Sequence, residues 1–144
     1  MPTVLQPQSE AALMTYLSQL LPEDGVRART LAHAWAAAGG TIHVGRHAIR
    51  LLGQAGGHTF TAATLHASAG PHGQPCLELC RVILEKHGVD ADKWQEWADE
   101  RPELRLHGFH DHAKYPVVRL GQLDDAALAR LALGLRDLAL WTKA

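Results

Sequence analysis

The sequence predicts an α+β fold, in which a small, mostly antiparallel sheet of about five short strands carries helices packed on one face. Two observations favour this class. Apolar residues recur at helical spacing near both ends of the chain, and short runs with strand character, separated by glycines, lie between residues 41 and 67. The predicted order is ααβββααββα, in one domain over residues 1–144 that begins with a short tail, residues 1–8.

Two helices are predicted before the first strand. Ser9 is a suitable N-cap for the first helix, and Pro22 ends it. Its apolar residues recur at helical spacing: Leu13, Leu17, Leu20 and Leu21. The second helix spans about residues 24–38, and the Gly39-Gly40 pair provides its C-terminal stop. Its apolar candidates are Val26, Leu31, Ala34 and Trp35.

The hydrophobic period then changes from helical to strand-like. TIHV and AIRLL are two short β-type runs, separated by a hairpin-length gap that contains Gly45. HTFTAATLHA follows as a third strand, so the three runs predict an antiparallel meander. The composition of residues 68–75 predicts a loop.

The second half is predicted to contain three helices and two strands. CLELCRVILEKHG, residues 76–88, is predicted as a helix with Glu78 on its solvated face, and Asp90 or Asp92 caps a short helix that buries two tryptophans. ELRLHGF and YPVVRLG, residues 103–109 and 115–121, are predicted strands. A long helix opens at Asp124-Asp125, and its leucines form a stripe that can serve the core or a homodimer interface: Leu128, Leu131, Leu135 and Leu138.

Composition narrows the class of protein. The chain is 47% hydrophobic and 20% charged, with no apolar run that approaches a membrane span and no secretion signal at its start. We therefore expect a cytoplasmic protein with reduced thiols and no membrane partner. The net charge of −1 argues against a surface that attracts nucleic acid everywhere.

The charges are distributed unevenly along the sequence. No Asp or Glu occurs between Gly25 and Cys76, whereas this segment has six histidines and four arginines: Arg27, Arg29, Arg46 and Arg50. Arginine pairs well with phosphate and carboxylate oxygens because its forked donors contact two oxygens at once. We therefore expect a small binding domain that contacts nucleic acid or an acidic protein surface through residues 25–76.

The segment HGFHDH provides an alternative, metal-binding hypothesis. On an extended chain His110 and His112 point to the same side with Asp111 turned away, and His107 can join them if the chain turns at Gly108. Histidine pairs of this kind bind zinc, nickel or copper. We otherwise expect no cofactor, and we expect the Cys76 and Cys80 side chains to pack as small apolar groups rather than to ligate zinc.

The sequence gives little indication of an enzymatic function. The sequence contains no GxGxxG, no Walker loop, no GxSxG and no HExxH motif. A nucleophilic Cys76, placed at a predicted helix start and activated by one of the histidines, is a further alternative. The expectation is that the protein is not an enzyme.

Overall fold

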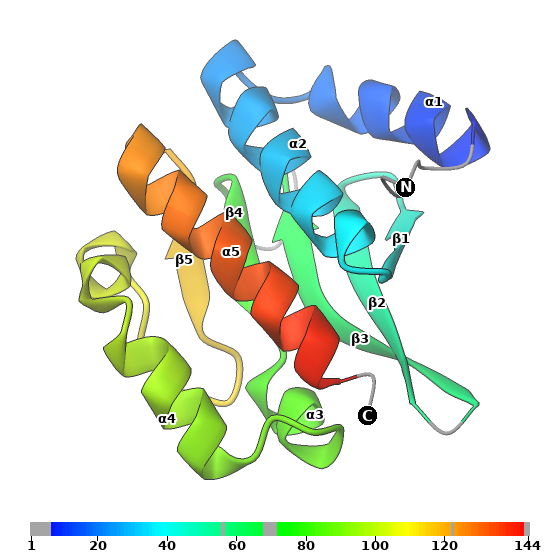
Figure 1. The fold of residues 1–144 in the computed structure, drawn as a ribbon. Coiled ribbons are helices and arrows are strands. Elements are labelled where there is room, and N and C mark those ends of the chain that lie inside the picture. Colours follow the sequence, from blue (N-terminus) through cyan, green and yellow to red (C-terminus); the bar gives the residue numbers. More distant parts are fainter. Residues whose placement is uncertain (1–6, 56, 68–71, 122, 143–144) are drawn as a thin grey trace.

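The fold is that of a computed structural model, which describes residues 7–55, 57–67, 72–121 and 123–142 (Figure 1). Helices and strands alternate in groups along the chain. In order, the elements are α1 (Pro7–Leu17), α2 (Pro22–Ala37), β1 (Thr41–Val44), β2 (Ala48–Ala55), β3 (His58–His66), β4 (Cys76–Leu79), α3 (Arg81–Lys86), α4 (Ala91–Asp99), a 3₁₀ helix η1 (Pro102–His107), β5 (Val117–Arg119) and α5 (Asp125–Trp141).

The five strands form one antiparallel sheet in the order β1-β2-β3-β4-β5. The helices α2 and α5 lie across one face of this sheet, with α1 beside β1 (Figure 1). α4 packs beside α5, since the indole of Trp97 donates a hydrogen bond of 3.0 Å to the carbonyl of Gly134. The described helices therefore form a second layer on one side of the sheet, as the α+β class requires.

The core lies between the sheet and this helix layer. Successive residues of a strand point to opposite faces, so alternate residues supply the core. From the strands these are Ile49, Leu51, Ala63, Leu65, Leu77, Leu79 and Val118, all buried. From the helices they include Leu13, Leu31, Trp35, Trp94, Trp97, Leu131, Leu135 and Leu138. Burial of each large side chain stabilises the fold by about 1.5–3 kcal/mol.

The predicted class, with its mostly antiparallel sheet and one-sided helix layer, is confirmed. β1 coincides with TIHV, β2 extends AIRLL to Ala55, and β3 ends one residue before the end of HTFTAATLHA. α2 ends before Gly39, whose φ is 93°. α1 begins at Pro7, within the predicted tail, and therefore includes Ser9 rather than starting after it. Residues 1–6 and residues 68–71 of the predicted loop lie outside the described residues. Val26 is exposed, unlike the other apolar candidates of α2.

The prediction of one helix over residues 76–88 is wrong. Residues 76–79 form β4, and the helix α3 begins only at Arg81. β4 pairs with β3 through Leu65 and Leu77, and the amide of Cys80 donates to the carbonyl of Ala62. The apolar spacing in CLELC fits either a helix or a strand buried on both faces. Backbone hydrogen bonds to β3 stabilise the strand, so the segment adopts that structure.

The prediction of a strand over residues 103–109 is also wrong. This segment forms the 3₁₀ helix η1, which ends at Gly108 with a φ of 85°. The alternating leucines that suggested a strand have different environments, because Leu104 is buried whereas Leu106 is 76% exposed. Pro102 at the first helical position favours a helical start. β5 then lies inside the predicted strand 115–121.

Two of the three predicted helix starts in the second half are confirmed by their caps. Asp90 accepts a hydrogen bond from the amide of Lys93, and Asp124 accepts one from the amide of Ala127. Three leucines of the C-terminal stripe are fully buried and Leu128 is partly buried, so the stripe forms core. The homodimer stays a prediction. Among the described residues, none of the helices combines the length and apolar character needed to cross a membrane.

Candidate functional site on the open face of the sheet

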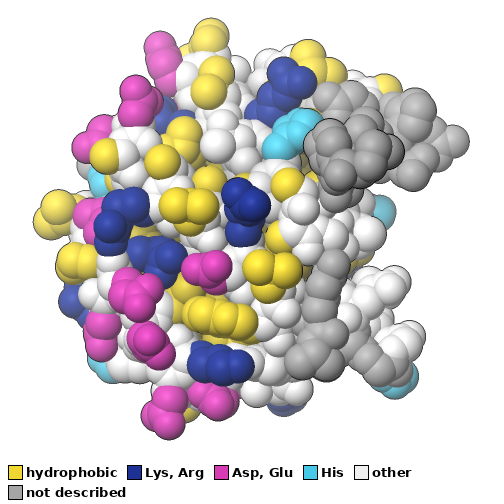
Figure 2. All heavy atoms as spheres, viewed as in Figure 1, with side chains coloured by type: hydrophobic (Ala, Val, Ile, Leu, Met, Phe, Trp, Pro, Cys, Tyr) yellow, Lys and Arg dark blue, Asp and Glu magenta, His cyan; other side chains and the backbone are white. Residues whose placement is uncertain are grey.

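The sheet face opposite the helices is the surface we call the open face. Cross-strand partners share a face of an antiparallel sheet, so the register assigns its residues. One row across the sheet contains His43, Arg50, Thr64, Glu78 and Val117, and the next contains Ala48, His66, Cys76 and Arg119. The exposed members of the open face are His43, Arg50 and Arg119, whereas Thr64, His66 and Cys76 are buried. The described helices pack on the other face, where acidic and basic side chains are mixed (Figure 2).

The structure does not bring the four predicted arginines onto one surface. Arg50 lies exposed on the open face, with Nη2 at 3.3 Å from Nδ1 of His43. Arg27 belongs to α2 on the other side of the sheet, where it pairs with Asp24 at 3.0 Å. Arg29 is an exposed residue of the same helix, and Arg46 lies in the β1–β2 turn. The four arginines therefore do not share a surface, and phosphate binding by all of them stays a prediction.

Two cations of the open face are free of acidic partners. Among the described residues, neither Arg50 nor Arg119 forms an ion pair, and both are exposed. Sequence reasoning missed Arg119, because it lies outside the acid-free segment. Strand alternation identifies it: Val118 points into the core, so the Arg119 side chain leaves β5 on the open face. Its guanidinium lies beside Gly108, at the end of η1.

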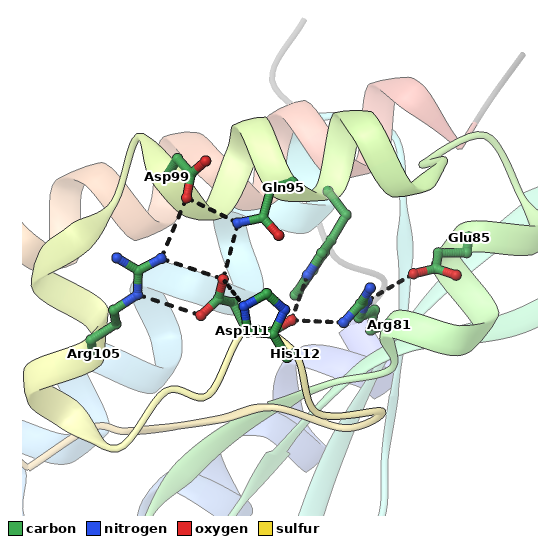
Figure 3. Close-up of polar contacts among 8 residues, drawn as sticks. Arg81, Glu85, Gln95, Asp99, Arg105, Asp111 and His112 are labelled. Carbon is green, nitrogen blue, oxygen red and sulfur yellow. Dashed lines mark hydrogen bonds and ion pairs between the residues drawn. The ribbon is translucent and has the colours of Figure 1, made fainter.

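Asp111 fixes the HGFHDH segment against α4 (Figure 3). Its buried carboxylate accepts hydrogen bonds from Arg105 at 3.3 Å and from Gln95 at 3.1 Å. Its backbone carbonyl accepts two more, from Arg81 and from the indole of Trp94. Burial alone would raise the pKa of Asp111, but the hydrogen bonds from Arg105 and Gln95 outweigh it and lower the pKa below its ordinary value.

The three histidines around Asp111 have different environments. His110 and His112 are exposed but lie in a turn rather than on the predicted extended segment, since the amide of Ala113 donates to the carbonyl of His110; His107 is half-buried. Within the described residues, these three do not form a group whose ligand atoms meet around one point. Metal binding by His107, His110 and His112 stays a prediction.

One group of metal-ligand side chains does converge among the described residues, and it lies on the open face. Ligand atoms of His66, His72 and Glu78 all lie within 4.8 Å of one another. Nε2 of His66 is 3.2 Å from Oε1 of Glu78, and Nε2 of His72 is 3.5 Å from Oε2. Sequence analysis missed this group because Glu78 was assigned to a helix face, and only strand register places it beside His66.

Both thiols are buried and unpaired. Cys76 begins β4 rather than a helix, so the premise of a thiol activated by a helix start is wrong. Burial, and secondarily the charge of Glu78, raises the pKa of Cys76 to about 12 and that of Cys80 to about 11. A raised pKa keeps a thiol protonated and therefore unreactive at neutral pH.

Native thiols are accordingly expected to react slowly with a disulfide reagent at pH 8. Labelling should become fast in denaturant, because unfolding exposes both side chains and returns the thiol pKa to its ordinary range. Time-resolved absorbance with and without urea measures both rates. Rapid labelling of Cys76 in the folded protein would contradict its burial.

Comparison of the chain with protein-family models, curated proteins and solved structures finds no match.

Proposed function

We propose that this protein is a binding domain that takes an acidic polypeptide segment on the open face of its sheet. One observation carries the proposal: Arg50 and Arg119 are exposed there without an acidic partner among the described residues. An exposed guanidinium pairs with a partner's carboxylate through two parallel hydrogen bonds, so the pair supports a preferred orientation as well as attraction.

The rest of the open face suits a polypeptide better than a nucleic acid. No Phe, Tyr or Trp occurs among its described residues, so it offers no platform for base stacking. Half-buried apolar residues, including Leu52 and Val117, can contact the stems of a peptide's side chains.

Charge reversal at the two arginines is expected to weaken binding of a fluorescein-labelled oligoglutamate peptide. At low salt the double variant Arg50→Glu/Arg119→Glu should lose at least about fivefold in affinity, equivalent to about 1 kcal/mol. The matched control Arg136→Glu changes an exposed arginine of α5, on the helix side. Fluorescence anisotropy measures the affinity of the wild type, the double variant and the control. Because the double variant reverses two charges and the control reverses one, the losses are compared per reversed charge.

Two outcomes would contradict the proposal. The first is equal loss of affinity per reversed charge at Arg136 and on the open face, which would mean that attraction depends on net charge alone. The second is tighter binding of duplex DNA than of oligoglutamate, with a log–log salt slope of about −0.9 per neutralised phosphate, which would favour nucleic acid.

A further inference from the structure

We propose that His66, His72 and Glu78 form a binding site for a divalent transition metal, with zinc as the ion that fits them best. The three side chains come from the end of β3, the connection after it, and β4. The proposal does not depend on the acidic-segment function, because it uses none of the arginines.

Strand register brings the first and last of these residues together. His66 pairs across the sheet with Cys76, and Thr64 pairs with Glu78, so His66 and Glu78 are diagonal neighbours on the open face. Diagonal neighbours on adjacent antiparallel strands lie within reach of long side chains. His72 lies six residues from each of them in the sequence, and its ring meets that of His66 edge to face, with centroids 4.8 Å apart.

The donor set matches the chemistry of zinc. Two imidazole nitrogens and one carboxylate are common zinc ligands, and three protein ligands leave a fourth tetrahedral position for water or another ligand. The two histidines approach different oxygens of the same carboxylate, at 3.2 Å and 3.5 Å. Only modest side-chain movement is needed to bring all three from these contacts to ligand distances of about 2.0–2.2 Å around one ion.

Burial also favours ion binding at this position. The His66 residue is only 8% exposed, and Nε2 is the ring nitrogen that faces Glu78. An ion and its ligands attract one another more strongly where water is largely excluded. Glu78 and His72 are more open, with side chains 25% and 31% exposed, so an ion can enter from the solvent side.

Zinc titration of protein stripped of metal by a chelator tests the site. Calorimetry should show one zinc ion per chain for the wild type. His72→Ala and Glu78→Gln each remove one ligand atom, so affinity should fall by more than the roughly 10–100-fold typical of losing a residue that only supports a ligand. His43→Ala removes another exposed histidine of the same face and should keep wild-type affinity.

The variants also separate this site from its alternatives. Zinc should raise the melting temperature of the wild type and of Arg50→Glu/Arg119→Glu, but not that of His72→Ala. Circular dichroism without zinc should show that each variant is folded, and the partly exposed position of His72 makes its variant the decisive one. Absence of stoichiometric zinc binding by the folded wild type would overturn the proposal. So would binding that survives in both ligand variants but is lost in His110→Ala/His112→Ala.

Discussion

Gly134→Ala is expected to destabilise the protein, although alanine is normally the better residue inside a helix. Gly134 lies in the middle of α5, where helix propensity alone favours alanine by about 1 kcal/mol. A Cβ at this position, however, would lie 2.6 Å from Nε of Arg101 and 2.9 Å from the indole of Trp97. Both neighbours are buried side chains, and Trp97 hydrogen-bonds from α4 to α5, so neither side chain can move away freely.

The expected cost of this overpacking is a loss of about 1–3 kcal/mol in the free energy of unfolding. Trp97 donates its indole hydrogen to the carbonyl of Gly134, and the guanidinium of Arg101 lies 4.7 Å from the Trp97 ring. A shift of α4 away from the new methyl group would weaken both contacts. Packing therefore outweighs the gain in helix propensity.

Gly25→Ala is the matched control. Gly25 also lies inside a helix, but a Cβ there would meet its nearest neighbour, the carbonyl oxygen of Leu17, at an ordinary 3.7 Å. The control should therefore stabilise the protein by about 0.5–1 kcal/mol. Urea unfolding of the two variants gives both values. Stabilisation by Gly134→Ala would show that α4 and α5 pack less closely than the structure has them.

Asp111→Asn is expected to give the second large effect, by releasing the HGFHDH segment from α4. The substitution keeps the shape of the side chain but turns an amide donor toward the donors of Arg105 and Gln95. At pH 7 the free energy of unfolding should fall by about 1–3 kcal/mol, the usual penalty for breaking a buried, charge-assisted hydrogen bond. Asp99→Asn, which removes an exposed carboxylate that contacts the same arginine, should cost less than about 1 kcal/mol.

The effect of Asp111→Asn should depend on pH in a defined direction. The pKa of Asp111 in the folded protein is lowered below its value in the unfolded chain. The carboxylate therefore contributes its full stability above the unfolded value of about 3.9, and the contribution is lost as pH falls through the folded pKa. The difference between wild type and variant should be largest near neutral pH and shrink below about pH 4. An undiminished difference at pH 2–3 would contradict an ionised, hydrogen-bonded Asp111.

Local signals in the sequence were sufficient to predict most helices and strands. They were not sufficient for the segments whose structure depends on hydrogen bonds to residues distant in the sequence. Gly39 and the alternation of TIHV and AIRLL located α2, β1 and β2, because each signal acts within a few residues. The four residues of β4 carry a pattern that fits either state, and hydrogen bonds to β3 decide between them. Secondary-structure propensity is overridden in this way wherever a short segment is paired by tertiary contacts.

The candidate site residues also differ in how far they could be predicted from local sequence. His110 and His112 are exposed as expected, but they lie in a turn rather than on an extended segment, and Asp111 is held by contacts that the sequence did not reveal. The group of His66, His72 and Glu78 was missed because its convergence depends on the β3–β4 register. The predicted arginine surface failed to assemble for a related reason: Arg27 is on the helix layer, whereas Arg50 alternates with core residues of β2.

The most direct test of the open face as a binding surface is an NMR titration that follows the Nε–Hε signals of the arginines. Addition of oligoglutamate should shift the signals of Arg50 and Arg119, because a bound carboxylate changes the environment of the guanidinium itself. The signals of Arg27 on α2 and Arg136 on α5, on the other side of the molecule, should stay in place. Shifts confined to Arg27 and Arg136, with Arg50 and Arg119 unchanged, would contradict the account and move the binding surface to the helices.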